Sequence, residues 1–260
     1  MELGLQGKTA LITGGSKGIG LACARAFLAE GARVALLSRS QANLDAATAA
    51  LDGGERVVTV AANLVDADAA KDGIRRAEQA LGPADVLVNS AGAARRYLPE
   101  ELTAAAWHAA MDAKYFTYIH AMDAVLPGMA ARGRGVVVNI IGMGGKVATP
   151  IHLPGGAANA ALMLATAGLA TVYAPKGIRI AGINPGSTLT DRVKEGLAVE
   201  ARLRGISPEE ALVQGQAKVP LRRYAAPEDI ARLAVFLASD QASYLTGAII
   251  PMDGGANPVI

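Results

Sequence analysis

Cysteine is almost absent from this chain, because Cys23 is the single cysteine among its 260 residues. An internal disulfide bond is therefore excluded. Cys23 falls within a predicted helix, where a buried and inert thiol is expected rather than a reactive one. This cysteine usage is typical of a reducing, cytoplasmic setting. We predict no metal site.

A strong excess of charge of one sign is also missing. The net charge of +2 is too small to indicate nucleic acid or an anionic membrane as a partner. The first eight residues lack the basic and then apolar run of a signal peptide. The longest apolar tract, residues 157–174, is interrupted by Asn159 and two threonines, so we interpret it as a buried or intersubunit helix and not as a membrane span.

What the chain does have is a regular alternation of short β-branched runs and alanine-rich helical stretches. The predicted strands are residues 9–13, 33–38, 57–61, 86–89, 135–141, 179–184 and 248–251. The predicted helices are residues 18–30, 41–51, 67–80, 103–131, 158–173 and 227–239. Apolar strands separated by helices imply a parallel sheet covered on both faces. We therefore predict one α/β domain, residues 1–260, with a three-layer doubly wound (Rossmann) sheet of about seven strands.

The segment 188–224 is the least regular part of the chain and interrupts the alternation after the sixth strand. Long insertions in compact domains are often lids over a site. Residues 188–224 are thus a candidate substrate lid, and surface decoration is the alternative interpretation.

A glycine-rich turn, Thr13–Gly20, joins the first strand to the first helix. Glycines at 14, 18 and 20 permit a tight turn and a close approach of the backbone to a phosphate. The helix N-terminus beyond them favours a pyrophosphate through its free N–H groups and its dipole. The placement between an apolar strand and a helix predicts a dinucleotide site.

The end of the second predicted strand distinguishes between the two nicotinamide dinucleotides. A carboxylate there would hold the adenosine ribose 2′-hydroxyl, but this chain has Ser38 and Arg39. Together with Lys17, Arg39 can neutralise a 2′-phosphate. We therefore favour NADP(H) over NAD(H), and the alternative is that both cations are ordinary solvated surface residues.

With these motifs the sequence resembles the classical short-chain dehydrogenases/reductases nearly end to end. Residues 13–20 match the TGxxxGIG motif of that family, and residues 89–92, Asn-Ser-Ala-Gly, resemble its NNAG motif. Asn63 and Leu64 stand where the family has an aspartate and an apolar residue flanking the adenine. Asn-Pro-Gly at 184–186, followed by Thr188, matches the motif at the nicotinamide end.

The resemblance implies a set of dinucleotide contacts and an oligomeric state. The C-terminal segment 244–255 looks like the strand and tail that commonly pack against another subunit in the family, so a homotetramer is implied. The substrate is implied to be a small molecule, which the sequence does not identify. The implied cofactor-binding residues are Gly14, Ser16, Lys17, Gly18, Ile19, Ser38, Arg39, Asn63, Leu64, Asn89, Ala91, Gly92, Asn159, Pro185, Gly186 and Thr188.

Catalysis in the family rests on an asparagine, a serine, a tyrosine and a lysine, and none stands at its matching position here. Those positions hold Lys114, Gly142, Gly155 and Asn159, in that order. No Tyr-x-x-x-Lys sequence occurs anywhere in the chain. Loss of a positioned general acid costs about 10²–10⁴-fold in rate. Glycine at the serine and tyrosine positions is expected to leave room where catalytic side chains would stand.

Two residues near the expected site are candidates for a substitute acid. His152 lies three residues before Gly155, and imidazole titrates near neutrality; the alternative is a solvated loop histidine. Lys114 is expected to face the same cleft, either as an acid whose pKa is lowered by burial or as a replacement for the missing lysine's volume and charge. Asn159 can still hydrogen-bond a ribose. Lys146 and Tyr115 are weaker candidates.

Charged residues beside the motifs admit two interpretations each. Arg95 and Arg96 follow the Asn-Ser-Ala-Gly motif, and they either bind an anionic substrate or are solvated. Residues 222–224 resemble the family's stretch ahead of the last long helix and are expected to be structural.

Three functional hypotheses follow. The first is an NADP(H)-dependent oxidoreductase with a rebuilt proton pathway, acting on a carbonyl or related substrate. The second is a nucleotide-binding pseudoenzyme, and the third is a lyase or isomerase that keeps the fold for non-redox work.

Overall fold

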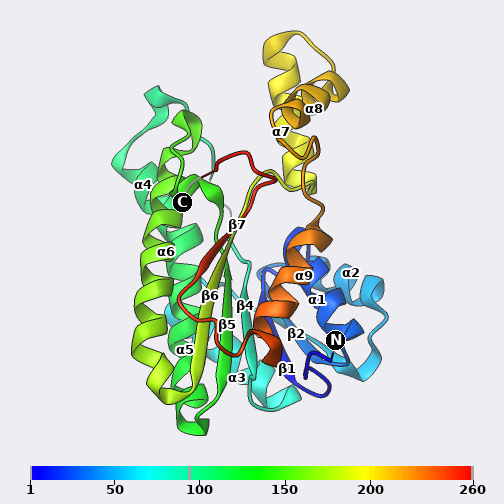
Figure 1. The fold of residues 1–260 in the computed structure, drawn as a ribbon, viewed down its shortest axis with the longest axis vertical. Coiled ribbons are helices and arrows are strands. Elements are labelled where there is room, and N and C mark those ends of the chain that lie inside the picture. The colour runs from blue at the N-terminus through cyan, green and yellow to red at the C-terminus, as the bar shows by residue number, and fades with distance from the viewer. Residues whose placement is uncertain (1, 93–94, 259–260) are drawn as a thin grey trace.

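The seven predicted strands form one parallel sheet in the computed structural model, which describes residues 2–92 and 95–258. The strand order is β3-β2-β1-β4-β5-β6-β7, so the order reverses between β1 and β4 as in doubly wound folds (Figure 1). The fold prediction is confirmed. The strands are β1 Thr9–Thr13, β2 Arg33–Ser38, β3 Val57–Ala61, β4 Val86–Asn89, β5 Gly135–Ile140, β6 Ile178–Pro185 and β7 Ile249–Met252.

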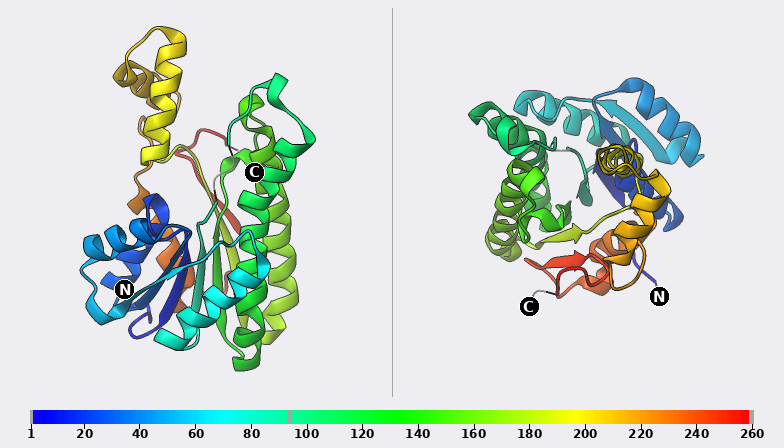
Figure 2. Two further views of the ribbon diagram at one scale, coloured as in Figure 1. Left: turned by 180° about the vertical axis from the view of Figure 1, so that it is seen from behind. Right: turned by 90° about the horizontal axis from the view of Figure 1, so that it is seen from above.

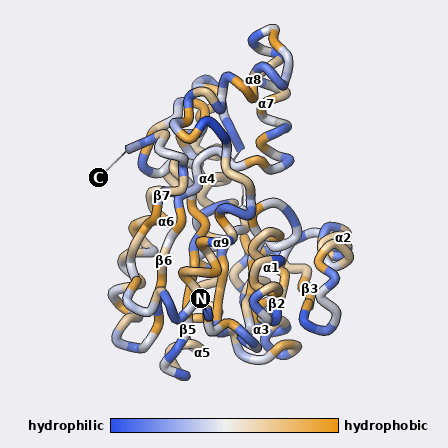
Figure 3. Tube along the Cα trace, turned by 45° about the vertical axis from the view of Figure 1, so that its right-hand side comes forward, coloured by the Kyte–Doolittle hydropathy of each residue, from blue (hydrophilic) through white to orange (hydrophobic). Residues whose placement is uncertain are grey.

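Helices cover both faces of the sheet, as Figure 2 shows from above. On one face α1 (Gly18–Ala29), α2 (Gln41–Leu51) and α9 (Pro227–Ala238) bury a core that includes Phe27, Leu44 and Ile230. On the other face α3 (Ala67–Leu81), α5 (Thr117–Arg132) and α6 (Leu153–Tyr173) bury a second core. Colouring by hydropathy shows the central strands as the most apolar part of the trace (Figure 3).

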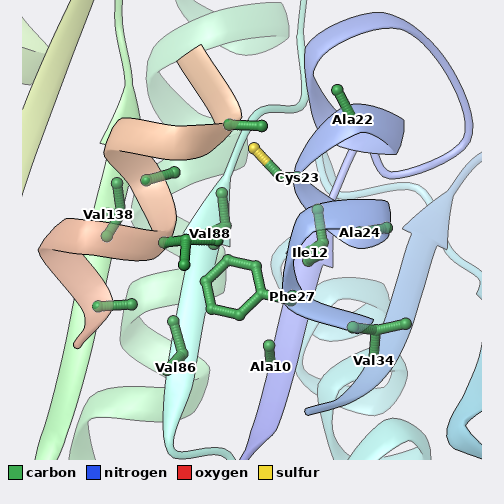
Figure 4. Packing of buried hydrophobic residues seen from close by; sticks show 14 of the residues in the cluster. Ala10, Ile12, Ala22, Cys23, Ala24, Phe27, Val34, Val86, Val88 and Val138 are labelled. Carbon is green, nitrogen blue, oxygen red and sulfur yellow. The ribbon is translucent and has the colours of Figure 1, made fainter. Parts of the chain in front are cut away.

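The first core surrounds Cys23, which is fully buried on α1. Figure 4 shows Phe27 of the same helix lying over β1 and β4, close to Val86 and Val88. Burial raises the pKa of the Cys23 thiol to about 12. The expectation of an inert thiol is consistent with this environment.

Local capping explains several helix boundaries. The side chain of Ser40 accepts a hydrogen bond from Asn43 N at 3.3 Å at the start of α2, and Asp66 accepts one from Ala69 N at 2.8 Å at the start of α3. Gly133 and Gly177 end their helices with φ of +67° and +73°, a conformation that favours glycine.

Two regions differ from the sequence-based expectation. The predicted helix 103–131 is instead α4 (Ala104–Ala110), a π-helical segment (Met111–Phe116) and α5. The segment 188–224, expected to be irregular, contains two helices, α7 (Asp191–Arg204) and α8 (Pro208–Ala217), which rise beyond the carboxyl edge of the sheet (Figure 1). The remaining short helices are Gly54–Arg56, Pro99–Glu101, Met143–Gly145, Pro150–His152, Ala174–Lys176 and Asp240–Ala242.

Helix α6 carries the longest apolar tract, and only one of its faces is buried. Ala158, Leu162, Thr166 and Ala170, each four residues apart, face the sheet, whereas Leu164 is 78% exposed. By length and composition alone the stretch Pro150–Lys176 could cross a membrane. One face of α6 packs on the sheet, and the expected intersubunit role of this helix stays a prediction.

Candidate functional site

The turn after β1 lies at the carboxyl edge of the sheet and requires glycine. Gly14 has a φ of +66°, and a Cβ added there would lie 2.8 Å from the backbone of Ala91. A Cβ on Gly20 would lie 2.3 Å from the carbonyl oxygen of Gly14, so the first turn of α1 packs directly on the loop. Lys17, the N-cap of α1, makes no side-chain capping bond, which leaves the first N–H groups of the helix available to a phosphate.

A buried chain of hydrogen bonds fixes the strand ends around this turn. Thr13 Oγ1 donates to Asn89 Oδ1 at 3.1 Å, and Asn89 Nδ2 donates to Asn139 Oδ1 at 3.0 Å. Asn139 Nδ2 donates in turn to Thr166 Oγ1 of α6 at 2.9 Å. All four side chains have 0% exposure. The side chain of Asn89, a residue predicted to bind cofactor, is therefore engaged by the side chains of Thr13 and Asn139.

The end of β2 meets the glycine-rich turn through a pair of serines. Ser16 Oγ donates to Ser38 Oγ at 3.1 Å. Lys17 and Arg39 are both exposed beside this contact, and neither forms an ion pair with a carboxylate in the described part of the chain. Their charges are thus available at the place where a 2′-phosphate is expected.

The remaining predicted nucleotide motifs also gather at the carboxyl edge. Gly92 has a φ of +88°, and a Cβ there would lie 2.0 Å from Ala113 O of the π-helical segment. Thr188, 4% exposed, donates through Oγ1 to Gly186 O at 3.3 Å. A Cβ on Gly18 would lie 3.2 Å from Thr190 Cγ2, so the loop after β6 returns to the glycine-rich turn.

The adenine-flanking pair follows β3 at the same edge. Leu64 is 4% exposed, and its carbonyl oxygen lies 3.0 Å from His120 Nδ1. Asn63 is exposed, and its Oδ1 accepts a hydrogen bond from Val65 N at 3.4 Å.

The loop after β5 turns at Gly142, next to the side chain of Asn159. Gly142 has a φ of +131°, which L side chains rarely adopt, and its N–H donates to Asn184 Oδ1 at 3.2 Å. A Cβ there would lie 3.1 Å from Asn159 Nδ2, so the amide of Asn159 already occupies the adjacent space. One side chain, that of Asn159, therefore borders the space expected at this position, and the expectation stays a prediction.

The same loop lies directly against the first turns of α6. A Cβ on Gly145 would lie 2.6 Å from Ala160 N, and a Cβ on Gly156 would lie 2.7 Å from Gly144 O. Glycine on both sides of the contact lets the two backbones touch. Gly155 is buried at the start of this helix.

His152 and Asn159 converge on this loop from the start of α6. A Cβ on Gly144 would lie 3.7 Å from His152 Nε2 and 3.5 Å from Asn159 Nδ2. His152 is only partly exposed, and its Nδ1 atom is buried. The structure thus brings the candidate acid, His152, and the candidate ribose-binding amide, Asn159, to the same loop. A freely solvated histidine would not be held there.

Lys114 lies in the π-helical segment and is 9% exposed. Its Nζ donates to Ile140 O at 2.9 Å and to Tyr118 Oη at 2.7 Å. Tyr118 Oη donates to Ile140 O at 2.5 Å. Lys114 therefore reaches the end of β5, just before Gly142, and its hydrogen bonds hold it there. These bonds favour the interpretation that Lys114 fills the space and charge of the missing lysine over the interpretation that it acts as an acid.

Lys146 is exposed, and Tyr115 packs edge-to-face on Phe116 with ring centroids 5.1 Å apart. Arg95 forms an ion pair with Glu101 at 3.5 Å and lines a pocket of about 300 Å³.

Residues 222–224 have mainly structural partners. Arg223 Nη1 donates to Asp229 Oδ2 at 2.6 Å at the start of α9, and this hydrogen bond and ion pair hold the pKa of Asp229 below its usual value. Burial raises the pKa of Tyr224, and the Glu200 carboxylate adds to this effect.

Sequence reasoning missed the roles of the buried side chains of Tyr118, Asn139 and Thr166. It named Asn184 as part of the Asn-Pro-Gly motif but did not foresee its hydrogen bond with Gly142 N. The spacing of Lys114 and Tyr118, four residues apart on a helix, could have indicated that pair. The asparagines stand at the ends of β5 and β6, but nothing local shows that their side chains turn inward.

The sheet is doubly wound, its glycine-rich turn follows β1, and the other motifs lie at the same edge. This arrangement is that of an α/β nucleotide-binding fold. No group of three or more histidine, cysteine or carboxylate residues able to hold a metal ion occurs among residues 2–92 and 95–258.

Comparisons with known proteins identify the family. The family model described as enoyl-(acyl carrier protein) reductase matches residues 14–257. The chain is 34% identical over 256 residues to 2-(S)-hydroxypropyl-CoM dehydrogenase 3 of Xanthobacter autotrophicus, covering 98% of both proteins. This chain belongs to the classical short-chain dehydrogenase/reductase family.

Solved structures agree with this assignment. L-Sorbose reductase from Gluconobacter frateurii, in complex with NADPH and L-sorbose, superposes with a TM-score of 0.94 at 30% identity over 100% of both chains. An NADPH-bound short-chain oxidoreductase from Pseudomonas aeruginosa PAO1, described as containing an atypical catalytic center, gives a TM-score of 0.87 at 31% identity over 97% of this chain and 98% of the other.

We predict that Gly142→Ala destabilises the fold by about 1–3 kcal/mol, because the φ of +131° is strained for any L side chain. Gly196→Ala is the control: it lies in α7, has an ordinary φ and meets nothing within 4 Å. Alanine there should leave stability unchanged or slightly higher. Urea unfolding of both variants measures the difference, and equal stabilities would contradict the role assigned to Gly142.

Proposed function

We propose that this protein is an NADP(H)-dependent oxidoreductase acting on a carbonyl or related substrate, with His152 as a non-standard proton donor. The observation that carries the proposal is the convergence of His152 Nε2 and Asn159 Nδ2 on Gly144, at the edge of the sheet where the nucleotide motifs gather. The family's four catalytic residues are replaced by Lys114, Gly142, Gly155 and Asn159, so an ordinary proton pathway is lacking.

The residues present fit a phosphorylated dinucleotide. The glycine-rich turn has no space for side chains at Gly14 and Gly20, and Lys17 and Arg39 lie beside it without carboxylate partners among the described residues. Structures with NADPH in their descriptions superpose closely on this chain, which supports the same cofactor here. When bound, the nicotinamide supplies or accepts a hydride.

The chain's own residues would then manage binding and the proton. Asn159 would hydrogen-bond the ribose, because an amide can both donate and accept. The imidazole of His152 would donate a proton to the substrate oxygen as negative charge develops there, provided that it comes within hydrogen-bond reach. Lys114 would hold the end of β5 through its bond to Ile140 O and so position the loop around Gly142.

The alternatives are a catalytically impaired nucleotide-binding pseudoenzyme and a non-redox lyase or isomerase. Gly142 and Asn159 support both alternatives. Position 142 cannot carry a serine without backbone strain, and Asn159 lacks the positive charge of a lysine. The helices α7 and α8 extend beyond the carboxyl edge, where a substrate lid would act in either case (Figure 2).

We predict that His152→Gln lowers kcat by about 10²–10⁴-fold, because the general acid is lost, while NADPH affinity is retained. The measurement is NADPH oxidation with a panel of ketoses, simple ketones, quinones and activated enones. His108→Gln, an exposed histidine on α4, is the matched control and should retain full activity.

Three outcomes of that experiment would decide between the hypotheses. Turnover that survives His152→Gln would refute the assigned acid and keep the enzyme. NADPH binding without turnover on any substrate would favour the pseudoenzyme. Conversion of a substrate with no net change in NADPH would favour the non-redox activity.

We predict that Arg39→Ala weakens NADPH binding by about tenfold or more and leaves NADH binding nearly unchanged, because only the former carries the 2′-phosphate. Fluorescence titration with both dinucleotides measures this. Arg25→Ala, an exposed arginine on the outer side of α1, is the control. Equal losses for the two dinucleotides would mean that Arg39 does not recognise the 2′-phosphate.

We infer a homotetramer in solution. Apolar side chains that are exposed in the single chain support it, notably Leu164 and Val172 on α6 at 78% and 58% and Tyr244 near the C-terminus. Light scattering coupled to size exclusion should give four times the mass of the chain, and Leu164→Glu should shift it to a smaller species. A monomeric wild-type protein would contradict the inference.

A further inference from the structure

A second pocket lies at the edge of the sheet opposite the nucleotide turn, where the amino ends of the strands meet. Its volume is about 350 Å³. The lining residues are Gln6, Gly7, Lys8, Arg33, Pro83, Asp85, Arg132 and Arg134.

The parallel strands explain why these residues meet. Lys8 precedes β1, Arg33 opens β2, Asp85 precedes β4 and Arg134 precedes β5. Because the amino ends of parallel strands lie at one edge, four residues distant in sequence come together there. The glycine-rich turn follows the other end of β1, a strand of 5 residues, and so lies about 17 Å away.

The pocket carries a strong excess of positive charge. Four of its residues are cationic and Asp85 is the one carboxylate among the lining residues. Asp85 is already engaged, since its Oδ2 accepts a hydrogen bond from Thr9 N at 3.0 Å and its Oδ1 lies 3.8 Å from Arg134 Nε. Cations gathered in a concave site repel one another and attract an anion.

Two of the guanidinium groups are held in place by the protein. Arg33 Nη2 donates to Thr9 Oγ1 at 3.0 Å, and Arg132 Nη2 donates to Ala84 O at 2.6 Å. Each guanidinium has five N–H donors, so each of these arginines keeps further donors for a ligand.

Arg33 Nε is buried and has no hydrogen-bond partner within the described residues, so this atom is not open to the pocket. A ligand in the pocket would therefore meet the Nη atoms of this guanidinium and not its Nε.

We propose that this pocket binds a small oxyanion with at least two negative charges, of the phosphate or carboxylate class. Arg33 and Arg132 bind it through their fixed guanidinium groups, whose fork geometry matches two oxygens of either class. Lys8 and Arg134 add positive charge at the rim. The site is independent of the nucleotide site, because the two lie at opposite ends of β1.

The test is calorimetric titration of the full chain with inorganic pyrophosphate at fixed ionic strength, with citrate in a parallel arm to separate phosphate from carboxylate preference. Because pyrophosphate can also enter the glycine-rich turn, Lys17→Gln distinguishes the two sites. Arg33→Gln and Arg132→Gln should each weaken the pocket's affinity by about tenfold or more. Lys17→Gln, and the control Lys71→Gln on an exposed surface of α3, should leave that affinity unchanged.

Arg132 bridges α5 to the segment before β4, so its variant could unfold. Two further single variants, Lys8→Gln and Arg134→Gln, keep the test decisive, because neither side chain is hydrogen-bonded to the backbone in the described structure. Each of these variants should weaken anion binding about two- to fivefold. No pyrophosphate or citrate binding, loss only in Lys17→Gln, or equal loss in Lys71→Gln would each overturn the proposal. None of these outcomes depends on turnover of NADPH, so the oxidoreductase hypothesis can fail separately.

Discussion

The buried hydrogen-bond chain from Thr13 through Asn89 and Asn139 to Thr166 is the constraint on which the carboxyl edge depends. It joins β1, β4 and β5 to α6 inside the apolar core, with every member at 0% exposure. Removing one member would leave a buried polar partner unsatisfied, which costs about 1–3 kcal/mol. The chain therefore fixes the relative positions of the nucleotide turn, the loop after β5 and the helix that carries Asn159.

The part of this fold that could be predicted from the sequence is the part that depends on local residue patterns. The bounds of β1 to β4 follow from short apolar runs between glycines and alanine-rich helices, and the sheet follows from their alternation. The turn at Gly14 was predictable because its conformation depends on its own residue types. The π-helical segment at Met111–Phe116 was not predicted, because the helical pattern of 103–131 does not distinguish it from the α-helices on either side.

In the candidate site, too, sequence motifs predicted the positions of residues along the chain but not the contacts between them. Counting along the family motifs placed Gly142 and Asn159 at separate positions, as if each were an independent replacement. In the structure they form one unit, because the amide of Asn159 fills the space next to Gly142 and the glycine loop touches the backbone of α6. A serine at 142 would meet both a strained φ and the Asn159 amide.

The two edges of the sheet attract anions by different physical means, and this difference bears on what each can recognise. At the carboxyl edge, backbone N–H groups at the start of α1 meet a phosphate, with Lys17 and Arg39 exposed beside them. Such a site selects its ligand mainly by shape, because the positions of backbone donors are fixed by the fold. At the amino edge, the donors are the side chains of Arg33 and Arg132, fixed by Thr9 and Ala84. That edge would therefore select mainly for charge.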